Sequence, residues 1–549
     1  MVDRGFDVVV IGRGPVGLSL SAMLAQAGHR VASVERHRDL YGLPRAGHID
    51  HEIVRILQSL GAAEPVLADS YPTTEYVWKN AHGETLLEFD WGAKGLSGYN
   101  SDFMYFQPIM ERALNERLAE SPTVADYSGW ECDELRAADG GVDVTLRKTS
   151  IVPGQARPVA GDEIQVLHAR FLVAADGANS AVRRRLGISR DDLGFNERWL
   201  VVDVRKKRDF ALAFDCGQIC DPARPITVLP LGKRHRRWEW AMLPGETVEE
   251  LEQPETAWRL LEDWNVTPDD AEIVRQLVYT FEARLATEWR RGGVFLMGDA
   301  CHTMPPFMGQ GMCSGIRDAK NLAWKIDLVL RGIADDPLLD TYELERLPHA
   351  RDWTVISLEA GKIPCTLDPD VARERDAKFR AGWLPPLPNF PKIETGVIDE
   401  DGGEASRALA GQLALQGRVE QGGKVDLFDN LFPPRGFSIV SMAGDPRSVL
   451  SAEQLAILEA LRTSFADIGT SGGGDADAVD VDGTYAEYFG RHCIAVVINR
   501  PDFYVFGAVA QLADLPPLVD RLIARLGARA GAPSSLSANR AVQPVQAVA

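Results

Sequence analysis

The residues that could do chemistry first appear as a glycine-rich turn near the start of the chain. Residues 12–17, GRGPVG, match the G-x-G-x-x-G fingerprint of a dinucleotide-binding turn between a strand and a helix. In such a turn Gly12 allows the tight bend, Gly14 admits a pyrophosphate, and Gly17 lets the helix pack closely on the strand. The N–H groups that open the helix would then face the phosphates.

Glu35 supports the same interpretation, because it ends the next predicted strand, where a carboxylate can accept hydrogen bonds from ribose hydroxyls. Pro15, at the first helical position, and Arg36, beside the carboxylate, complete the candidate contacts at this end. A strand–turn–helix without a ligand is the alternative. The sequence contains no second such fingerprint, so we expect any second dinucleotide to bind elsewhere or transiently.

These residues must be positioned by alternating strands and helices, which predict an α/β domain. Apolar runs at 6–11 and 31–34 predict buried strands, and the helix between them spans 15–27. Further helices are predicted at 51–61, 107–119 and 314–331. Further strands are predicted at 142–147, 164–175, 199–205, 225–230, 237–243, 295–297, 437–440 and 494–498.

Two later segments place an aspartate beside a glycine after a predicted strand. Residues 171–183 read FLVAADGANSAVR, and residues 296–306 read LMGDACHTMPP. The second segment continues through a Gly-Gln-Gly turn at 309–311 into DAKNLAWK at 318–325.

These segments resemble the DG and GD motifs of class A flavoprotein monooxygenases, and the turn and the helix after it match that family closely. The resemblance implies FAD as the bound cofactor, with NADH or NADPH as co-substrate. It also implies that O2 adds to the reduced flavin to form a C4a-hydroperoxide, which hydroxylates a phenol. The FAD contacts that it implies beyond the first turn are Arg45, Gln107, Asp176, Arg183, Gly298, Asp299, Pro305, Gly309, Gln310, Gly311 and Met312.

The family also implies roles at the reacting ring. His48, Pro305 and Pro306 are the candidate catalytic residues, because the two prolines shape the loop beside the flavin. His48, His302 or a tyrosine–water chain could remove the phenolic proton. For Cys301 and Cys313, which depart from the family pattern, packing is the favoured interpretation.

The middle of the chain narrows the resemblance. Residues 220–225, 237–240 and 242–247, with 49–52, resemble the 3-(3-hydroxyphenyl)propionate hydroxylases. That implies ortho-hydroxylation of a phenolic acid to a catechol, with Arg205, Arg224 or Arg237 as candidate ligand of the substrate carboxylate.

Other functions stay open at this stage. The alternatives are a polyketide- or antibiotic-modifying monooxygenase, an oxidase or halogenase, and a non-catalytic FAD redox sensor. Residues 238–240, WEW, lack the Ile-Pro that completes the halogenase motif.

We predict that the FAD-binding domain spans 1–190 and 286–361, interleaved with a β-rich substrate domain at 191–285 that also includes about 75–105. A connector at 362–399 leads to a domain at 400–527. Residues 500–505, RPDFYV, resemble a signature of the thioredoxin-like domain in the phenol-hydroxylase branch, which implies a structural or dimer-forming role. Residues 528–549 are predicted to be disordered.

Composition limits the partners. The chain has 549 residues and a net charge of -20, which argues against nucleic acid or an anionic membrane as partner. No apolar run is long enough to span a membrane, and no signal peptide is evident. Its 7 cysteines contain no Cys-x-x-Cys pair, so we expect a cytoplasmic protein with free thiols and no metal site.

Overall fold

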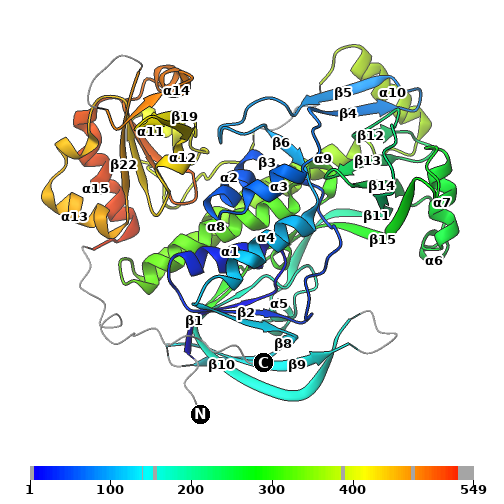
Figure 1. The fold of residues 1–549 in the computed structure, drawn as a ribbon, viewed down its shortest axis with the longest axis horizontal. Coiled ribbons are helices and arrows are strands. Elements are labelled where there is room, and N and C mark those ends of the chain that lie inside the picture. The colour runs from blue at the N-terminus through cyan, green and yellow to red at the C-terminus, as the bar shows by residue number, and fades with distance from the viewer. Residues whose placement is uncertain (1–4, 139, 152–156, 385–389, 471–475, 530–549) are drawn as a thin grey trace.

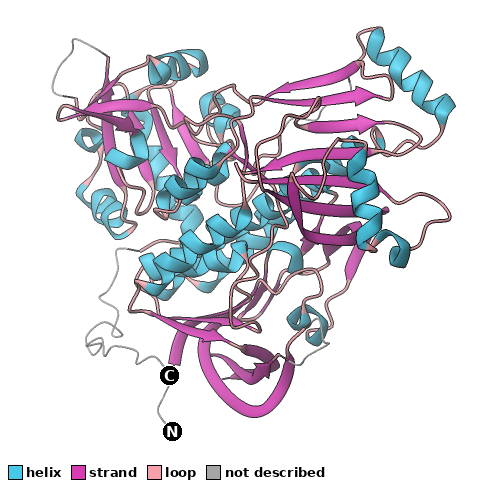
Figure 2. Cartoon of the chain, turned by 45° about the vertical axis from the view of Figure 1, so that its right-hand side comes forward, coloured by secondary structure: helices cyan, strands magenta, loops and turns pink. Residues whose placement is uncertain are grey.

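The chain folds into layers of helix and sheet arranged around a long central helix (Figures 1 and 2). The computed structural model describes residues 5–138, 140–151, 157–384, 390–470 and 476–529. Figure 1 shows a sheet at the bottom, a second sheet at the right and a C-terminal lobe at the upper left.

The first sheet is built around the N-terminal strand. In spatial order its strands are β16 (Arg290–Arg291), β17 (Val294–Leu296), β10 (Val159–Ala174), β1 (Gly5–Ile11), β2 (Val31–Glu35) and β7 (Val124–Ser128). The strands β17, β10, β1, β2 and β7 run parallel, and the middle of β1 is fully buried, as expected for a sheet covered on both faces. β8 (Trp130–Ala138) and β9 (Gly141–Ser150) continue from β10 as an antiparallel ribbon.

Three helices lie over this sheet (Figure 1). α1 (Pro15–Gln26) packs against α8 (Gln310–Leu330) and α4 (Gln107–Ala119). The shorter helices α2 (His51–Ser59) and α3 (Ala63–Asp69) contact α8 and α4, respectively, whereas α5 (Ala181–Arg185) contacts β8. The long helix α9 (Thr341–Lys362) follows α8 and packs on it.

The second sheet is mostly antiparallel. In spatial order it contains β18 (His302–Thr303), β15 (Ala271–Ala286), β11 (Arg190–Lys206), β14 (His235–Ala241), β13 (Ile226–Leu231), β12 (Gly217–Cys220), β4 (Glu75–Asn80) and β5 (Thr85–Asp90). β12 pairs in parallel with β4, so an early segment of the chain returns to form one edge of this sheet. Between the sheets, β3 (His48–Asp50) pairs with β6 (Asp102–Met104). The helices α6 (Val248–Leu251) and α7 (Pro254–Glu262) follow β14 in the chain.

The C-terminal lobe is a mixed sheet with its own helices. Its strands are, in spatial order, β20 (Lys424–Leu427), β19 (Arg418–Gln421), β23 (Ala478–Asp480), β22 (Ser464–Gly469), β21 (Ser438–Ser441), β24 (Val496–Asn499) and β25 (Val505–Val509). β21 runs parallel to β22 and antiparallel to β24, which pairs antiparallel with β25. Its helices are α11 (Glu404–Leu409), α12 (Phe428–Leu431), α13 (Ala452–Ala460), α14 (Thr484–His492) and α15 (Leu515–Leu526).

Three segments differ from the sequence interpretation. α8 begins at Gln310 rather than near 314, so the Gly-Gln-Gly turn is the first turn of the helix. The predicted connector contains α10 (Pro369–Arg380), which Asp368 caps by accepting two backbone N–H bonds. Ala528 is buried at the start of the predicted tail, whereas 530–549 lie outside the described residues.

Candidate active site

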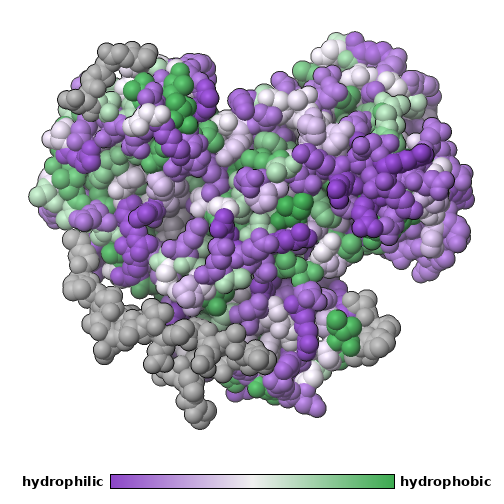
Figure 3. All heavy atoms as spheres, in the orientation of Figure 1, coloured by the Kyte–Doolittle hydropathy of each residue, from purple (hydrophilic) through white to green (hydrophobic). Residues whose placement is uncertain are grey.

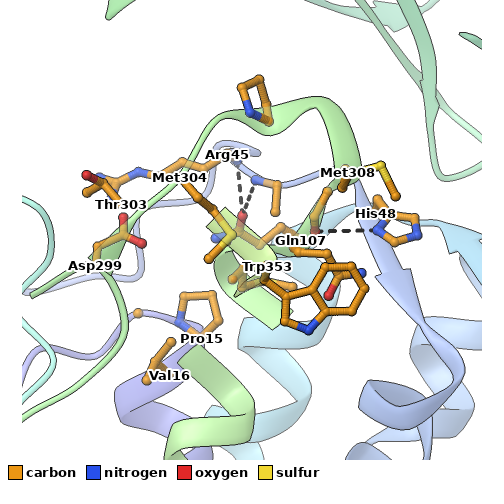
Figure 4. Close-up of a pocket in the computed structure, with 18 of the residues that line it drawn as sticks. Pro15, Val16, Arg45, His48, Gln107, Asp299, Thr303, Met304, Met308 and Trp353 are labelled. Atoms are coloured by element: carbon orange, nitrogen blue, oxygen red, sulfur yellow. Dashed lines mark hydrogen bonds between the residues drawn. The ribbon is translucent and has the colours of Figure 1, made fainter. Parts of the chain in front are cut away.

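A cavity of about 2080 Å³ is lined by both large sheets, by the start of α8 and by residues of α9. Figure 4 shows part of it, with Pro15 and Asp299 from the nucleotide side, Met308 from the loop before α8 and His48 from β3. Of the predicted site residues, those that line the cavity are Gly12, Gly14, Pro15, Glu35, Arg36, Arg45, His48, Gln107, Asp176, Asp299, Pro306, Gly309, Gln310, Gly311 and Met312. Gly17, Arg183, Gly298 and Pro305 do not line it.

The three glycines of the first turn meet different surroundings. A Cβ on Gly12 would lie 2.3 Å from the Ala175 carbonyl oxygen, and one on Gly17 would lie 1.9 Å from the Gly12 oxygen. A Cβ on Gly14 would meet no protein atom within 4 Å. Gly12 and Gly17 are therefore required by packing, whereas Gly14 leaves open a space at the N-terminus of α1, which no side chain caps. This space suits a pyrophosphate.

Glu35 is oriented by backbone donors. Its carboxylate accepts hydrogen bonds from the N–H of Arg13 at 3.0 Å and from the N–H of His37 at 3.1 Å. The remaining lone pairs can accept ribose hydroxyls at the cavity wall. Arg36 lines the same wall.

Gln107 fixes the loop that carries Arg45. Its Oε1 accepts the N–H of Arg45 at 3.1 Å and of Ala46 at 2.7 Å (Figure 4). Its Nε2 donates to Glu111 at 2.7 Å. The Arg45 guanidinium lies over the ring of Tyr41, 4.5 Å from its centroid, and makes no ion pair with a described carboxylate. A cation at the cavity wall without an anionic partner fits a phosphate ligand.

The DG segment lines the cavity with Asp176 and its neighbours, whereas Arg183 points into the fold. Asp176 caps the short helix after it by accepting the N–H of Ala181 at 2.8 Å, while its Oδ1 is buried without a described hydrogen-bond partner. Arg183 donates to the carbonyls of Ala300 at 2.8 Å and Ala178 at 3.0 Å, so it ties this segment to the GD segment.

The GD segment turns at Gly298, whose φ of 59° is left-handed and suits glycine. Asp299 follows and faces the cavity; its enclosure in the fold raises the pKa of its carboxyl group, and His302, Arg45 and Arg190 oppose that rise. A carboxyl group here fits a hydroxyl ligand such as ribityl or ribose.

The loop before α8 ends at Gly309, which has a φ of 63° and precedes the first helical residue. No side chain caps this helix of 21 residues, so the N–H groups of Gln310, Gly311 and Met312 open toward the cavity. A helix N-terminus stabilises negative charge, as a reduced flavin ring would require. Together with the space at Gly14 and the orphaned Asp176 oxygen, this donor set fits FAD.

His48 contacts this loop from β3. Its Nε2 lies 2.7 Å from Oδ1 of Asp102, and its Nδ1 lies 3.4 Å from the Gly309 oxygen (Figure 4). Burial alone would lower the pKa of His48, but Asp102 and Cys313 together raise it well above its ordinary value. A charged imidazole with two acceptors is a donor at neutral pH, not a base.

The other candidate bases, His302 and a tyrosine, differ in whether they line the cavity. His302 is fully buried outside the cavity lining, with its Nε2 2.7 Å from Asp318, which also pairs with Arg346. This is a structural contact. Four tyrosines line the cavity, Tyr41, Tyr76, Tyr279 and Tyr504, and the sequence identifies none of them as the base.

The candidate ligands of a substrate carboxylate are all paired. Arg205 pairs with Glu272 and Arg224 with Glu246, and neither arginine lines the cavity. Arg237 does line it, but its guanidinium donates twice to Asp203, at 2.6 and 3.0 Å, and also to the carbonyls of Pro44 and Arg45.

The two cysteines that depart from the family pattern, Cys301 and Cys313, are fully buried. Among the described residues, no group of histidine, cysteine or acidic side chains is arranged to hold a metal ion. The described helices include none long and apolar enough to cross a membrane.

Comparison with known proteins defines the class. The FAD binding domain family matches residues 5–357, and the HcaD C-terminal domain family matches residues 411–525. The chain belongs to the class A FAD-dependent aromatic monooxygenases and is a flavoprotein aromatic hydroxylase.

Individual relatives match nearly the whole chain. A probable NADH-specific resorcinol 4-hydroxylase of Rhodococcus jostii is 37% identical, covering 95% of this chain and 95% of that protein. A 3-(3-hydroxy-phenyl)propionate/3-hydroxycinnamic acid hydroxylase of a Mycobacterium species is 32% identical, covering 93% and 90%. The corresponding enzyme of Escherichia coli O81 is also 32% identical, covering 92% of each chain.

Solved structures agree on the fold. The flavin-dependent monooxygenase PieE superimposes with a TM-score of 0.76 at 21% identity, covering 96% of this chain and 99% of that one. Aklavinone-11 hydroxylase gives a TM-score of 0.73 at 24% identity, covering 96% and 100%.

Proposed function

We propose that the enzyme uses NADH and O2 to hydroxylate a small neutral phenol of the resorcinol kind, ortho to a hydroxyl group. The observation that carries this proposal is the pairing of Arg237: the one candidate carboxylate ligand at the cavity is already bound to Asp203 and to two carbonyls. A substrate carboxylate beside Arg237 would have to compete with Asp203 and the two carbonyls for the guanidinium N–H groups, which would cost binding free energy.

Glu239 strengthens the preference for a neutral ring. It lines the cavity, and its Oε1 lies 3.6 Å from Nη1 of Arg237, so a second carboxyl group of the protein already shares that cation. A carboxyl group in the wall disfavours a second carboxylate from the substrate. The R. jostii relative, named for resorcinol and NADH, is consistent with this choice.

The phenolic acid 3-(3-hydroxyphenyl)propionate is the second candidate, supported by relatives named for it at 32% identity. For this substrate the enzyme would have to solvate the carboxylate or move Arg237.

The cofactor contacts are proposed from the geometry above. Bound FAD supplies the redox centre that accepts a hydride and activates O2. Gly12, Gly14, Pro15 and Arg45 would hold its pyrophosphate, with Arg36 and Glu35 at the ribose. Gln107, Asp176, Arg183, Gly298 and Asp299 would hold or support the segments around the ribityl chain.

At the ring, Pro306, Gly309, Gln310, Gly311 and Met312 would form the wall on the α8 side, and Pro305 would shape the loop behind that wall. The α8 N-terminus would stabilise negative charge on the reduced ring. We assign His48 to positioning this loop, because both of its nitrogens already face acceptors.

We further propose that residues 400–527 form a thioredoxin-like domain. The order β22-β21-β24-β25, in which the first neighbouring pair is parallel and the next two pairs are antiparallel, supports this assignment. No described Cys-x-x-Cys is present there, so its role would be structural.

The test measures oxidation of NADH and of NADPH by the FAD-loaded enzyme with resorcinol, with 3-(3-hydroxyphenyl)propionate and with neither. We expect resorcinol to stimulate NADH oxidation with hydroxylated product equal to NADH consumed. Stimulation and coupling by the phenolic acid alone would reject the neutral substrate. Peroxide without product for every phenol would reject the hydroxylase assignment.

A further inference from the structure

A line of hydrogen-bonded polar side chains crosses the second sheet where it faces the cavity. Tyr76 lies on β4, Gln218 on β12 and Thr227 on β13, and all three line the cavity. Gln218 is directly opposite Thr227 across one strand pair, and it aligns with Trp78 across the other. Adjacent strands therefore bring together residues that are far apart in the sequence.

The hydrogen bonds give this line a direction. Thr227 Oγ1 donates to Gln218 Oε1 at 2.8 Å, and Gln218 Nε2 donates to the Tyr76 hydroxyl oxygen at 2.8 Å. The Tyr76 hydroxyl hydrogen then has no acceptor among the described residues and is available to a ligand. The three side chains are only 7%, 2% and 3% exposed, so water competes poorly for this donor.

The surroundings are aromatic and lead to the loop before α8. Tyr76 stacks on Trp91, with centroids 4.8 Å apart and planes 17° apart, and Trp91 lies 5.4 Å from His48. His48 in turn contacts the Gly309 oxygen at 3.4 Å. Phe307, from the same loop, belongs to the same apolar cluster as Tyr76. The donor thus lies in an apolar chamber that adjoins the proposed flavin wall.

A second donor lies on the same face of β4. Trp78 lines the cavity, is 2% exposed, and its Nε1–H has no hydrogen-bond partner among the described residues. Buried donors without partners are costly unless a ligand satisfies them. A ligand with an aromatic ring and hydroxyl oxygens would fill the chamber and accept these hydrogens.

We propose that Tyr76, oriented by Gln218 and Thr227, recognises a hydroxyl oxygen of the phenolic substrate. This inference rests on the proposed hydroxylase function and adds the residues that select an oxygen-bearing ring over a bare one. Burial raises the pKa of Tyr76 well above its ordinary value, so the group stays a donor throughout the assay range. Gln218 and Thr227 are positioning residues that hold the tyrosine hydroxyl in this orientation.

The experiment compares ligand binding to FAD-loaded wild type, Tyr76→Phe, Gln218→Met and Thr227→Val, followed by the flavin absorbance change. The ligands are resorcinol and benzene, which differ only in hydroxyl groups. We expect Tyr76→Phe to bind resorcinol about 10-fold more weakly, since a buried hydrogen bond contributes about 1 kcal/mol or somewhat more, and to bind benzene unchanged. Gln218→Met and Thr227→Val should weaken resorcinol binding in the same sense by smaller factors.

Tyr127→Phe is the matched control, because Tyr127 is also 7% exposed and its hydroxyl also accepts one amide hydrogen bond, from Gln165, away from the cavity. This control should bind resorcinol as wild type does. Equal resorcinol affinity in Tyr76→Phe and wild type, with wild type still hydroxylating phenols, overturns the hydroxyl site alone. Absence of phenol binding and turnover in wild type overturns both this inference and the proposed function.

Discussion

At the scale of single residues, the same residue type serves opposite needs in the first turn. Gly12 and Gly17 are glycines because neighbouring carbonyl oxygens leave no room for a Cβ, whereas Gly14 faces open space. A packing requirement can be tested without cofactor, whereas a ligand requirement needs the cofactor. The two kinds of glycine should therefore separate in experiment.

Comparing Gly14→Ala with Gly17→Ala distinguishes the requirement for cofactor binding from the requirement for packing. We expect Gly17→Ala to destabilise the cofactor-free protein, because its Cβ would lie 1.9 Å from the Gly12 oxygen. Gly14→Ala should keep the thermal midpoint of the cofactor-free protein and weaken FAD affinity at least 10-fold, because the methyl group enters the proposed pyrophosphate space. Unchanged FAD affinity in Gly14→Ala would place the pyrophosphate elsewhere.

His48 gives a prediction about pH. Its folded pKa lies well above the unfolded value of about 6.5, so its contribution to stability is complete below that pH and declines as pH rises through the folded pKa. His48→Gln should lower the free energy of unfolding by about 1.5–3 kcal/mol at pH 6, with a smaller loss at pH 9. Urea unfolding at both pH values measures this. A loss independent of pH would mean that the imidazole is neutral in the fold.

How far the sequence predicts the site depends on how local each signal is. The turn at 12–17 and the Gly-Gln-Gly turn are contiguous, so their backbone roles follow from residue type. Tyr76, Gln218 and Thr227 meet only through the register of three strands, one pair of which is parallel and joins segments that are distant in sequence. The periodicity of apolar residues predicts the strands but not the register in which they pair. The sequence predicts a connector where α10 forms, because this segment is charged and precedes a proline-rich run.

At the scale of elements, α8 organises the site. Its first turn faces the cavity, and residues further along it, Asp318, Asn321 and Lys325, bind buried groups of the surrounding helices and the C-terminal lobe. The position of the proposed flavin wall is therefore set by contacts along the entire helix, and by His48 at its start.

Gly309→Ala tests the entry to this helix. A side chain at a φ of 63° costs about 1–2 kcal/mol, and its Cβ would also lie 2.4 Å from Nδ1 of His48. We expect a larger fall in thermal midpoint than for Gly332→Ala, at the other end of α8, where φ is 68° and no atom lies within 4 Å of the added Cβ. An equal fall in thermal midpoint for both variants would show that the His48 side chain can move away from the added Cβ without loss of stability.

At the scale of the whole molecule, the C-terminal lobe is docked by buried charge. Arg500 donates to Glu345 at 2.6 Å and to Asp502 at 2.7 Å, and Lys325 donates to Glu345 at 2.7 Å. Burial favours protonation of Glu345, but the charges of Arg500 and Lys325 prevail and lower its pKa to about 2.

On the exterior, hydrophilic residues cover much of the face shown in Figure 3, most continuously over the right-hand lobe.

Arg500→Ala should therefore be severe, because it leaves Glu345 and Asp502 buried without their main cation. We expect a loss of about 3–5 kcal/mol in the free energy of unfolding. Arg525→Ala, which removes partly exposed pairs with Glu400 and Asp401, should cost less than about 1 kcal/mol.

The contribution of Glu345 to stability is present above its unfolded pKa of about 4.3 and is lost as pH falls toward 2. The difference in stability between wild type and Arg500→Ala should therefore shrink in acid. A small loss at neutral pH would contradict the buried network.

The helix α8 carries the proposed flavin wall at its start and contacts the C-terminal lobe further along. Cofactor binding and docking of the lobe can therefore be thermodynamically coupled. If cofactor binding stabilises α8 and thereby the docked lobe, reciprocity requires the docked lobe to raise cofactor affinity by the same factor. We therefore expect the lobe to affect how firmly the enzyme retains FAD, although the proposed pyrophosphate contacts Gly12, Gly14, Pro15 and Arg45 all lie outside it.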